Sequence, residues 1–244
     1  MSALIAAKKT ILLVDGDTEN RDYLKGEFET RGFLILEADD TLEAIKVASA
    51  NKVNAVIIDI ELSKAQRVEF NVAIHSDACG SPLVFLIAGP SMISREEAYD
   101  LGASGVFSKP FDPELMIAQI GELLVPASTR WKRRLADEPR RSRRRVSMSV
   151  EKLRLGRGGF ALSLENAGPS LEGEVVEFDV RVNDQQDWSL RGSGVIRYIK
   201  RNVAATGRDT WGIEFASLDE ASLNQVMNRT ATDRPLSYIP KILN

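Results

Sequence analysis

The stretch ILLVDGD at residues 11–17 decides the fold of the first half of the chain. Its four apolar residues form an unbroken run, which predicts a strand buried on both faces of a parallel sheet. Asp15 and Asp17 follow the run directly, with Gly16 between them. Ligands bind beyond the carboxyl ends of the strands in open α/β sheets, so this stretch also predicts an acidic site at the sheet edge.

The same alternation of apolar runs and helical spacing continues to about residue 125. The runs that read as further strands are FLILEA, NAVIIDI, PLVFLIA and GVFSK, and a helical stretch follows each of them. Five continuous apolar strands separated by helices predict a doubly wound α/β domain with a five-stranded parallel sheet.

Two further charged residues end strands of this predicted sheet. Asp59 ends the third strand and Lys109, followed by Pro110, ends the fifth. With Asp15, they form a group that would bind a divalent cation such as Mg²⁺ through Asp15 and Asp59 and stabilise a phosphoryl group on one carboxylate. The alternative is that these aspartates only cap helices, a role for which Asp17 is well placed.

Residues 8 to about 125 resemble the receiver domain of two-component response regulators, which implies a flavodoxin-like fold. The resemblance rests on ILLVDGD, NAVIIDI and LGASGVFSKPFDPEL. It implies that Asp59 is the phosphoacceptor, that Asp15 is the first member of the family's acidic pair, and that Lys109 is the lysine of the site. It also implies a cis peptide bond between Lys109 and Pro110.

Three positions depart from the receiver pattern. Gly16 stands where the family has a second acidic residue that touches magnesium, and Ile87 stands where it has a threonine or serine. Val106 occupies the position of an aromatic switch residue. Because Mg²⁺ demands a regular set of oxygen ligands, the loss of one predicts a weakened metal site and a pseudoreceiver that serves as an interaction surface.

In the second half of the chain, apolar residues alternate with polar ones. In EGEVVEFDVRV the residues Val176, Phe178, Val180 and Val182 fall on one face, and TWGIEFASL repeats the pattern. These runs predict an antiparallel sheet or small β-barrel, followed by a helix in DEASLNQVMNRT that begins at Asp219 or Ser217. The tail DRPLSYIPKILN is expected to be irregular and packed on the surface.

Residues 140 to about 230 resemble a PilZ domain, a family of small β-barrels that bind cyclic di-GMP. The stretches that carry the resemblance are RRSRRR, GRGGFAL, LRGSGVIRYI and DTWGIEFASLDEASLNQVM. It implies that Arg140, Arg141 and Arg144 hold the phosphates of the dinucleotide, although Arg141 and Arg145 offer the same spacing.

The second PilZ motif has changed in this chain. Gly159 matches its glycine, but Arg154 stands where the family has an aspartate or asparagine, and Gly156 stands where it has a serine. An arginine side chain only donates hydrogen bonds and a glycine has no side chain, so both changes weaken the implied contacts to guanine.

Charge is distributed unevenly along the 244 residues. Residues 1–125 hold 20 acidic and 11 basic residues, whereas residues 126–145 hold 2 and 9. The basic segment reads as a solvated linker or as an extension of the last helix of the first domain. Nucleic-acid binding through it ranks last, because no helix-turn-helix pattern accompanies it.

The remaining composition excludes several classes of protein. One cysteine permits no intramolecular disulfide, and one histidine leaves too few of the usual ligands for a zinc site. No apolar run is long enough to cross a bilayer, so the expected location is the cytoplasm.

These observations predict a receiver domain at 1–125, a basic linker at 126–139 and a PilZ-like domain at 140–244. The expected function is two-component and second-messenger signalling, without enzymatic activity, in which the second domain binds cyclic di-GMP and the receiver binds Mg²⁺ weakly. The alternative is an adaptor that works through protein contacts alone. The expected partners are a histidine kinase or a downstream target protein.

Overall fold

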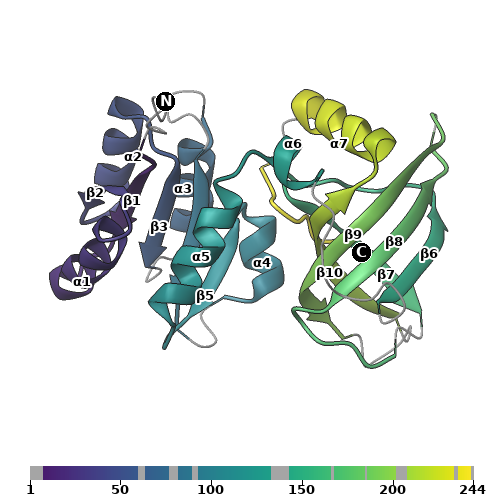
Figure 1. The fold of residues 1–244 in the computed structure, drawn as a ribbon, viewed down its shortest axis with the longest axis horizontal. Helices are drawn as coiled ribbons and strands as arrows, with labels where there is room; N and C mark the ends of the chain where they lie inside the picture. The colour runs from purple at the N-terminus through teal and green to yellow at the C-terminus, as the bar shows by residue number, and fades with distance from the viewer. Residues whose placement is uncertain are drawn as a thin grey trace, which may run out of the picture. The chain divides into compact units, whose positions relative to one another are not determined.

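A computed structural model describes residues 8–59, 64–76, 82–89, 93–132, 143–165, 168–184, 186–201, 208–233 and 236–242. The chain forms two compact units, each with a sheet of its own (Figure 1). The first unit comprises Met1–Ile93 and Ala103–Leu124, and the second comprises Ser94–Gly102 and Val125–Asn244.

The sheet of the first unit has the predicted five parallel strands. Their order is β2-β1-β3-β4-β5, where the strands are β1 (Thr10–Val14), β2 (Leu34–Ala38), β3 (Ala55–Asp59), β4 (Leu83–Ala88) and β5 (Gly105–Ser108). The second strand of the chain, β2, lies on one side of β1, and the third strand, β3, lies on the other side. The strand order therefore reverses between β1 and β3, and this switch point is where a doubly wound sheet opens a crevice.

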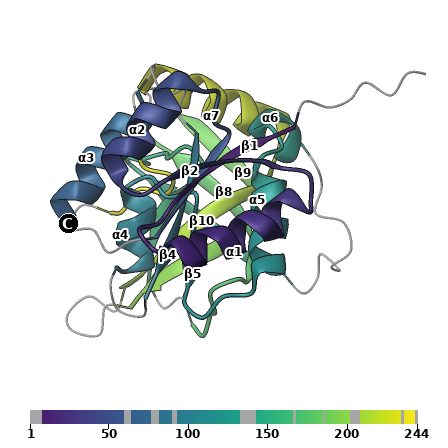
Figure 2. The same ribbon diagram turned by 90° about the vertical axis from the view of Figure 1, so that its left-hand side faces the viewer.

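Helices cover both faces of this sheet (Figures 1 and 2). The pair α1 (Thr18–Glu29) and α5 (Pro113–Leu123) lies on one face, and the pair α2 (Thr41–Ala50) and α3 (Lys64–Ile74) lies on the other. Leu24 and Phe28 of α1 are buried at the predicted i,i+4 spacing and pack with Met116 and Ile120 of α5. Burial on both faces explains why the strands read as unbroken apolar runs.

The sheet of the second unit is mixed. Its order is β6-β8-β9-β10-β7, where the strands are β6 (Arg144–Val150), β7 (Gly159–Glu165), β8 (Val175–Val182), β9 (Trp188–Lys200) and β10 (Arg208–Leu218). The prediction of an antiparallel sheet is wrong at β6, which runs parallel to β8. The reason is that β7 lies at the opposite edge, so the segment from β6 to β8 forms a long crossover and not a hairpin.

The core of the second unit follows the predicted alternation. Val176, Phe178, Val180 and Val182 are at most 3% exposed, and they pack with Phe160 and Phe215. Helix α7 (Glu220–Asp233) adds Leu223 and Val226 to this core. Asp219 caps the helix as predicted, because its Oδ1 accepts a hydrogen bond from the Ser222 N–H at 2.8 Å.

The start of the predicted linker contributes to the second core. Helix α5 ends at Leu123, Pro126 follows, and the short helix α6 (Ala127–Arg130) leads to Trp131, which is 1% exposed in that core. The alternative of one extended helix is wrong, because proline disfavours helical backbone in the residue before it. Residues 133–142 lie outside the described part of the chain.

A short helix and the irregular tail complete the second unit. Helix α4 (Arg95–Asp100) carries Tyr99, whose ring stacks on those of Tyr198 and Tyr238. The tail is irregular as predicted, and Tyr238 and Ile239 in it are at most 2% exposed. None of the described helices is both long enough and apolar enough to pass through a membrane.

Phe215 is a suitable residue for testing the packing of the second core. The centroid of its ring lies 5.1 to 6.3 Å from the centroids of three other aromatic rings. We expect Phe215→Ala to lower the free energy of unfolding of the second unit by about 3–5 kcal/mol, since it removes contacts and leaves a cavity. Trp131, Trp188 and Trp211 all lie in this unit, so tryptophan fluorescence in a denaturant titration measures it.

Leu171→Ala is the matched control, because Leu171 is 69% exposed. It is expected to change the free energy of unfolding by less than about 0.5 kcal/mol. Equal losses in the two variants would contradict the assignment of Phe215 to the core.

Candidate functional site

The candidate site of the first unit lies at the switch point of its sheet. Asp15 follows β1 and Asp59 is the last residue of β3, the two strands between which the strand order reverses. Both aspartates line the same small cavity of about 10 Å³, together with Arg21 and Ile87. The topology therefore brings together the two carboxylates that the sequence predicts at this edge.

Lys109 is the third charged residue of this site. Its Nζ forms an ion pair with the Asp59 Oδ2, and the peptide bond to Pro110 is cis as predicted. The Asp59 side chain is 12% exposed, so its charge is held mostly away from water. An ammonium in direct contact compensates that burial and stabilises the ionised carboxylate.

The environment of Asp15 disfavours its negative charge. Burial is the main cause that raises the pKa of Asp15 above its usual value, and the charge of Asp59 raises it further. The Asp17 N–H, which donates to the Asp15 Oδ1 at 2.8 Å, and the charge of Lys109 partly oppose this shift of the pKa. A cation beside Asp15 and Asp59 would relieve the same repulsion.

The residues between β1 and α1 do not supply a third carboxylate to this pair. Asp17 is the N-cap of α1, and its Oδ1 accepts hydrogen bonds from the Glu19 and Asn20 N–H groups at 2.9 and 3.3 Å. Gly16 has no side chain, although a Cβ at this position would meet only the Asp39 carbonyl oxygen, at 3.8 Å. Space for an acidic side chain is therefore present, and the side chain is missing.

Hydrophobic residues occupy the other two altered positions. Ile87 lies opposite Asp59 in the β3–β4 register and is 2% exposed, so it offers a phosphoryl oxygen no hydrogen bond. Val106 is 9% exposed, and the neighbouring Phe107 stacks on Phe85 with ring centroids 6.1 Å apart. The aromatic ring nearest to the switch position is thus packed against the core.

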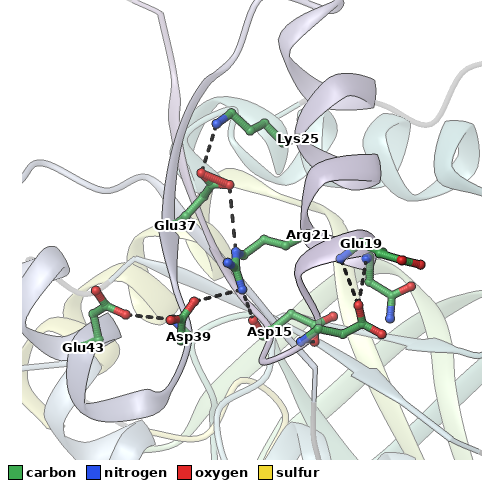
Figure 3. A network of polar contacts seen from close by, with 9 residues as sticks. Asp15, Glu19, Arg21, Lys25, Glu37, Asp39 and Glu43 are labelled. Carbon is green, nitrogen blue, oxygen red and sulfur yellow. Dashed lines mark hydrogen bonds and ion pairs between the residues drawn. The ribbon is translucent and has the colours of Figure 1, made fainter.

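Arg21 is a residue of the site that the sequence reasoning missed. Its guanidinium donates to the Asp15 carbonyl oxygen at 2.5 Å and pairs with the Asp39 carboxylate at 2.9 Å (Figure 3). Glu37 lies 3.9 Å from the guanidinium and pairs with Lys25 at 3.0 Å. With its side chain only 12% exposed, Arg21 ties the loop that carries Asp15 and Gly16 to the end of β2.

The donor set falls short of what Mg²⁺ needs. Asp15 and Asp59 supply carboxylate oxygens, but Lys109 already contacts Asp59, and Asp17 is bound to the first turn of α1. Nowhere in the described ranges do three or more His, Cys, Asp or Glu residues form a group that could hold a metal ion. The residues present therefore fit Mg²⁺ poorly, since it prefers a complete octahedral set of oxygens.

The arginines predicted to bind a nucleotide are only partly within the described residues. Arg140 and Arg141 lie outside them. Arg144 begins β6, donates to the Ser170 hydroxyl and places its guanidinium 5.5 Å from the centre of the Trp211 ring. Arg145 is exposed and pairs with Glu177 at 3.4 Å.

The tail of the second unit covers the Gly156–Gly159 loop, for which the sequence predicted a changed PilZ motif. Ser237 and Tyr238 accept hydrogen bonds, through their carbonyl oxygens, from the Arg157 and Gly158 N–H groups, each at 2.9 Å. A Cβ on Gly156 would lie 2.3 Å from the Tyr238 carbonyl oxygen. The absence of a side chain there is thus explained by the close approach of the tail.

The same packing extends to the first residue of β7 and to the Tyr238 side chain. A Cβ on Gly159 would lie 2.1 Å from the Ile213 carbonyl oxygen, so this position too excludes a side chain. Burial raises the pKa of Tyr238 well above its usual value, and the protonated hydroxyl donates to the Glu214 Oε1 at 2.6 Å. Arg197 pairs with the other oxygen of Glu214 at 2.5 Å.

Comparisons with known proteins agree with the geometry of the first unit. A family model described as response regulator receiver domain matches residues 11–121. The response regulator MprA of Mycobacterium sp. (strain KMS) is 29% identical over 114 residues, which are 47% of this chain and 50% of that protein. The transcriptional regulatory protein YvrH of Bacillus subtilis (strain 168) is 33% identical over 46% of this chain and 47% of its own length. The chain spans about half the length of the curated relatives it matches.

Solved structures match a similar share of the chain. The chemotaxis protein CheY4 of Vibrio cholerae is 20% identical with a TM-score of 0.42, over 47% of this chain and 98% of that chain. A receiver domain protein of Methanospirillum hungatei JF-1 is 25% identical with a TM-score of 0.43, over 48% of this chain and 94% of that one. By the family model and the curated relatives, residues 11–121 form a response regulator receiver domain, which is less than half of the chain.

Proposed function

We propose that this chain is a two-component signalling protein whose receiver domain is a pseudoreceiver. In this proposal it acts in the cytoplasm as an adaptor, through contacts with a histidine kinase or a downstream target protein, and it catalyses no reaction on an external substrate. The observation that carries the proposal is the incomplete acid site. Gly16 supplies no carboxylate, and the Asp17 carboxylate caps α1.

Three features of the site support this proposal over signalling by phosphorylation. Two carboxylates are too few for tight Mg²⁺ binding, and the cation is needed to neutralise the oxygens of an incoming phosphoryl group. Ile87 beside Asp59 cannot donate a hydrogen bond to that group. Phe107 is packed against Phe85, so β5 has no free aromatic ring near the altered switch position Val106.

The retained parts of the site also have a structural explanation. The ion pair between Lys109 and Asp59 joins the ends of β5 and β3, and Arg21 joins the loop after β1 to β2. The Asp59 side chain is 12% exposed, so removing Lys109 would leave its charge uncompensated, which is costly. Asp59 and Lys109 are therefore of use to the fold even in a receiver that is not phosphorylated.

Restoring the missing carboxylate tests the metal part of the proposal. We expect Gly16→Asp to bind Mg²⁺ at least tenfold more tightly than the natural chain in calorimetric titrations. The variant adds an oxygen ligand beside Asp15 and Asp59, at a position where a Cβ has room.

Gly16→Asn is the matched control, because it adds a side chain of the same size without the charge. It is expected to bind Mg²⁺ more weakly than Gly16→Asp. Equal affinities of the natural chain and Gly16→Asp would contradict the view that Gly16 weakens the site.

Phosphorylation of Asp59 can be tested by intact-protein mass spectrometry. After incubation with acetyl phosphate and Mg²⁺, we expect the natural chain to show no added phosphoryl group. The double variant Gly16→Asp with Ile87→Thr is expected to gain one, since it regains a metal ligand and a hydroxyl near Asp59.

The same double variant with Asp59→Asn serves as the control and should show no added mass. A phosphoryl group on Asp59 of the natural chain would overturn the pseudoreceiver proposal.

Calorimetric titration with cyclic di-GMP separates the adaptor from a nucleotide sensor. The adaptor proposal predicts no binding heat at micromolar protein concentrations. The tail contacts the Gly156–Gly159 loop, and Arg144 is engaged with Ser170 and Trp211.

A saturable heat that Arg144→Ala abolishes would contradict this prediction. It would favour the sensor interpretation of Arg140, Arg141 and Arg144. Circular dichroism spectra of both proteins establish that the comparison is made between folded chains.

A further inference from the structure

A groove separates the two edge strands of the second sheet. It has a volume of about 780 Å³ and is lined by residues of β6, of β7, of the segment between them and of the tail. We call it the β6–β7 groove. Because β6 and β7 stand at the two ends of the strand order, the groove lies where one more strand would close the sheet into a barrel.

The β6 side of the groove presents backbone groups that bond to no other strand among the described residues. The Val150 carbonyl oxygen accepts a hydrogen bond from the Asn183 N–H at 2.8 Å, so Val150 and alternate residues before it bond toward β8. Successive backbone groups of a strand point to opposite sides. The N–H and C=O groups of Ser147 and Ser149 therefore point away from β8, toward the groove, and among the described strands β6 pairs with β8 alone.

On the β7 side, the outward backbone groups of the second half of the strand bond to no other strand among the described residues. Gly158 and alternate residues after it face β10, because the Gly158 carbonyl oxygen accepts from the Phe215 N–H at 2.8 Å. Leu155 forms a bridge to Phe160 at the start of β7. Beyond this bridge, Ser163 and Glu165 direct their backbone groups toward the groove that both of them line.

The groove combines an apolar floor with a net positive lining. The apolar side chains that line it include Met148, Val150, Leu153, Leu162 and Leu164, which belong to or pack against the second core. The charged residues that line it are Glu151, Lys152, Arg154, Glu165, Arg208 and Lys241. Arg208 pairs with Glu165 and Lys241 pairs with Asp100, which leaves Lys152 and Arg154 against Glu151. This excess of positive charge favours an occupant with negative charge.

We propose that the β6–β7 groove binds an extended segment of a partner protein as an additional strand. The segment has apolar residues at alternate positions, which pack on the floor, and acidic residues at its ends. Its backbone bonds to Ser147 and Ser149 on one side and to Ser163 on the other. Strand addition of this kind takes its affinity from main-chain hydrogen bonds and its specificity from alternate side chains.

The directions of the edge strands support a single inserted strand. Because β8, β9, β10 and β7 alternate in direction and β6 follows β8, the two edges run antiparallel to each other. One added strand is then parallel to one edge and antiparallel to the other, and both ladders are allowed. The proposal is independent of whether Asp59 accepts a phosphoryl group, since every residue it uses lies in the second unit.

The test uses the full chain and a synthetic peptide. The probe has a core of seven residues, the length of β6, with valine at alternate positions, threonine between them and two glutamates at each end. Fluorescence anisotropy of the labelled probe is expected to give saturable binding in the micromolar range. A probe with N-methyl groups on three central amides should bind at least tenfold more weakly, because it has lost three donors.

Two pairs of variants locate the binding. Ser149→Pro and Ser163→Pro each remove an edge N–H and should weaken binding at least tenfold, whereas Ser149→Ala and Ser163→Ala keep the backbone and should change it less than twofold. A probe with lysines in place of the terminal glutamates should bind more weakly, and affinity for the glutamate probe should fall with salt.

Hydrogen exchange on the natural chain keeps the test decisive if a proline variant fails to fold. The probe is expected to slow exchange at the Ser147, Ser149 and Ser163 amides. Equal affinity for the N-methylated probe, or binding without this protection, would overturn the proposal. Protection of the same amides in a concentration-dependent dimer without the probe would also overturn it, because a second copy would then be the occupant.

Discussion

Coverage of both faces of the first sheet is the constraint on which the candidate site depends. Parallel strands need crossover connections, and the helices that make them bury the strands from both sides. All strand ends of one kind then meet at one edge, and the reversal of strand order between β1 and β3 places Asp15 beside Asp59. The two acids are neighbours because of topology, so the site persists although Gly16 has removed part of its chemistry.

Within this site, the residues that hold the loop after β1 also limit what the loop can bind. The Asp17 carboxylate satisfies two N–H groups at the start of α1, which would otherwise lack partners. Arg21 fixes the backbone of Asp15 from the other side and is itself neutralised by Asp39, which follows β2, and by Glu37. The same few carboxylates would thus be needed both to order the loop and to bind a cation.

Much of this structure could be predicted from the sequence, and the exceptions have physical causes. The buried strands could be predicted because each is a continuous apolar run in the sequence. Asp15, Asp59 and Lys109 could be predicted because each is a charged residue at the end of such a run. The direction of β6 could not be predicted, since alternation of side chains is the same in parallel and antiparallel pairs. Arg21 was missed because its partners, Glu37 and Asp39, come from another strand, and a lone arginine in a helix usually faces water.

The glycines from Gly156 to Gly159 are explained by contacts with residues that are distant in the sequence. Their local pattern resembles a turn or a damaged motif, whereas the structure shows that the space of their missing side chains is filled by Tyr238 and Ile213. Tyr238 follows every strand of the sheet in the chain, so a ribosome delivers it after the strands that it packs against. The strands of this unit therefore leave the ribosome before the residue that fills the space beside their glycines.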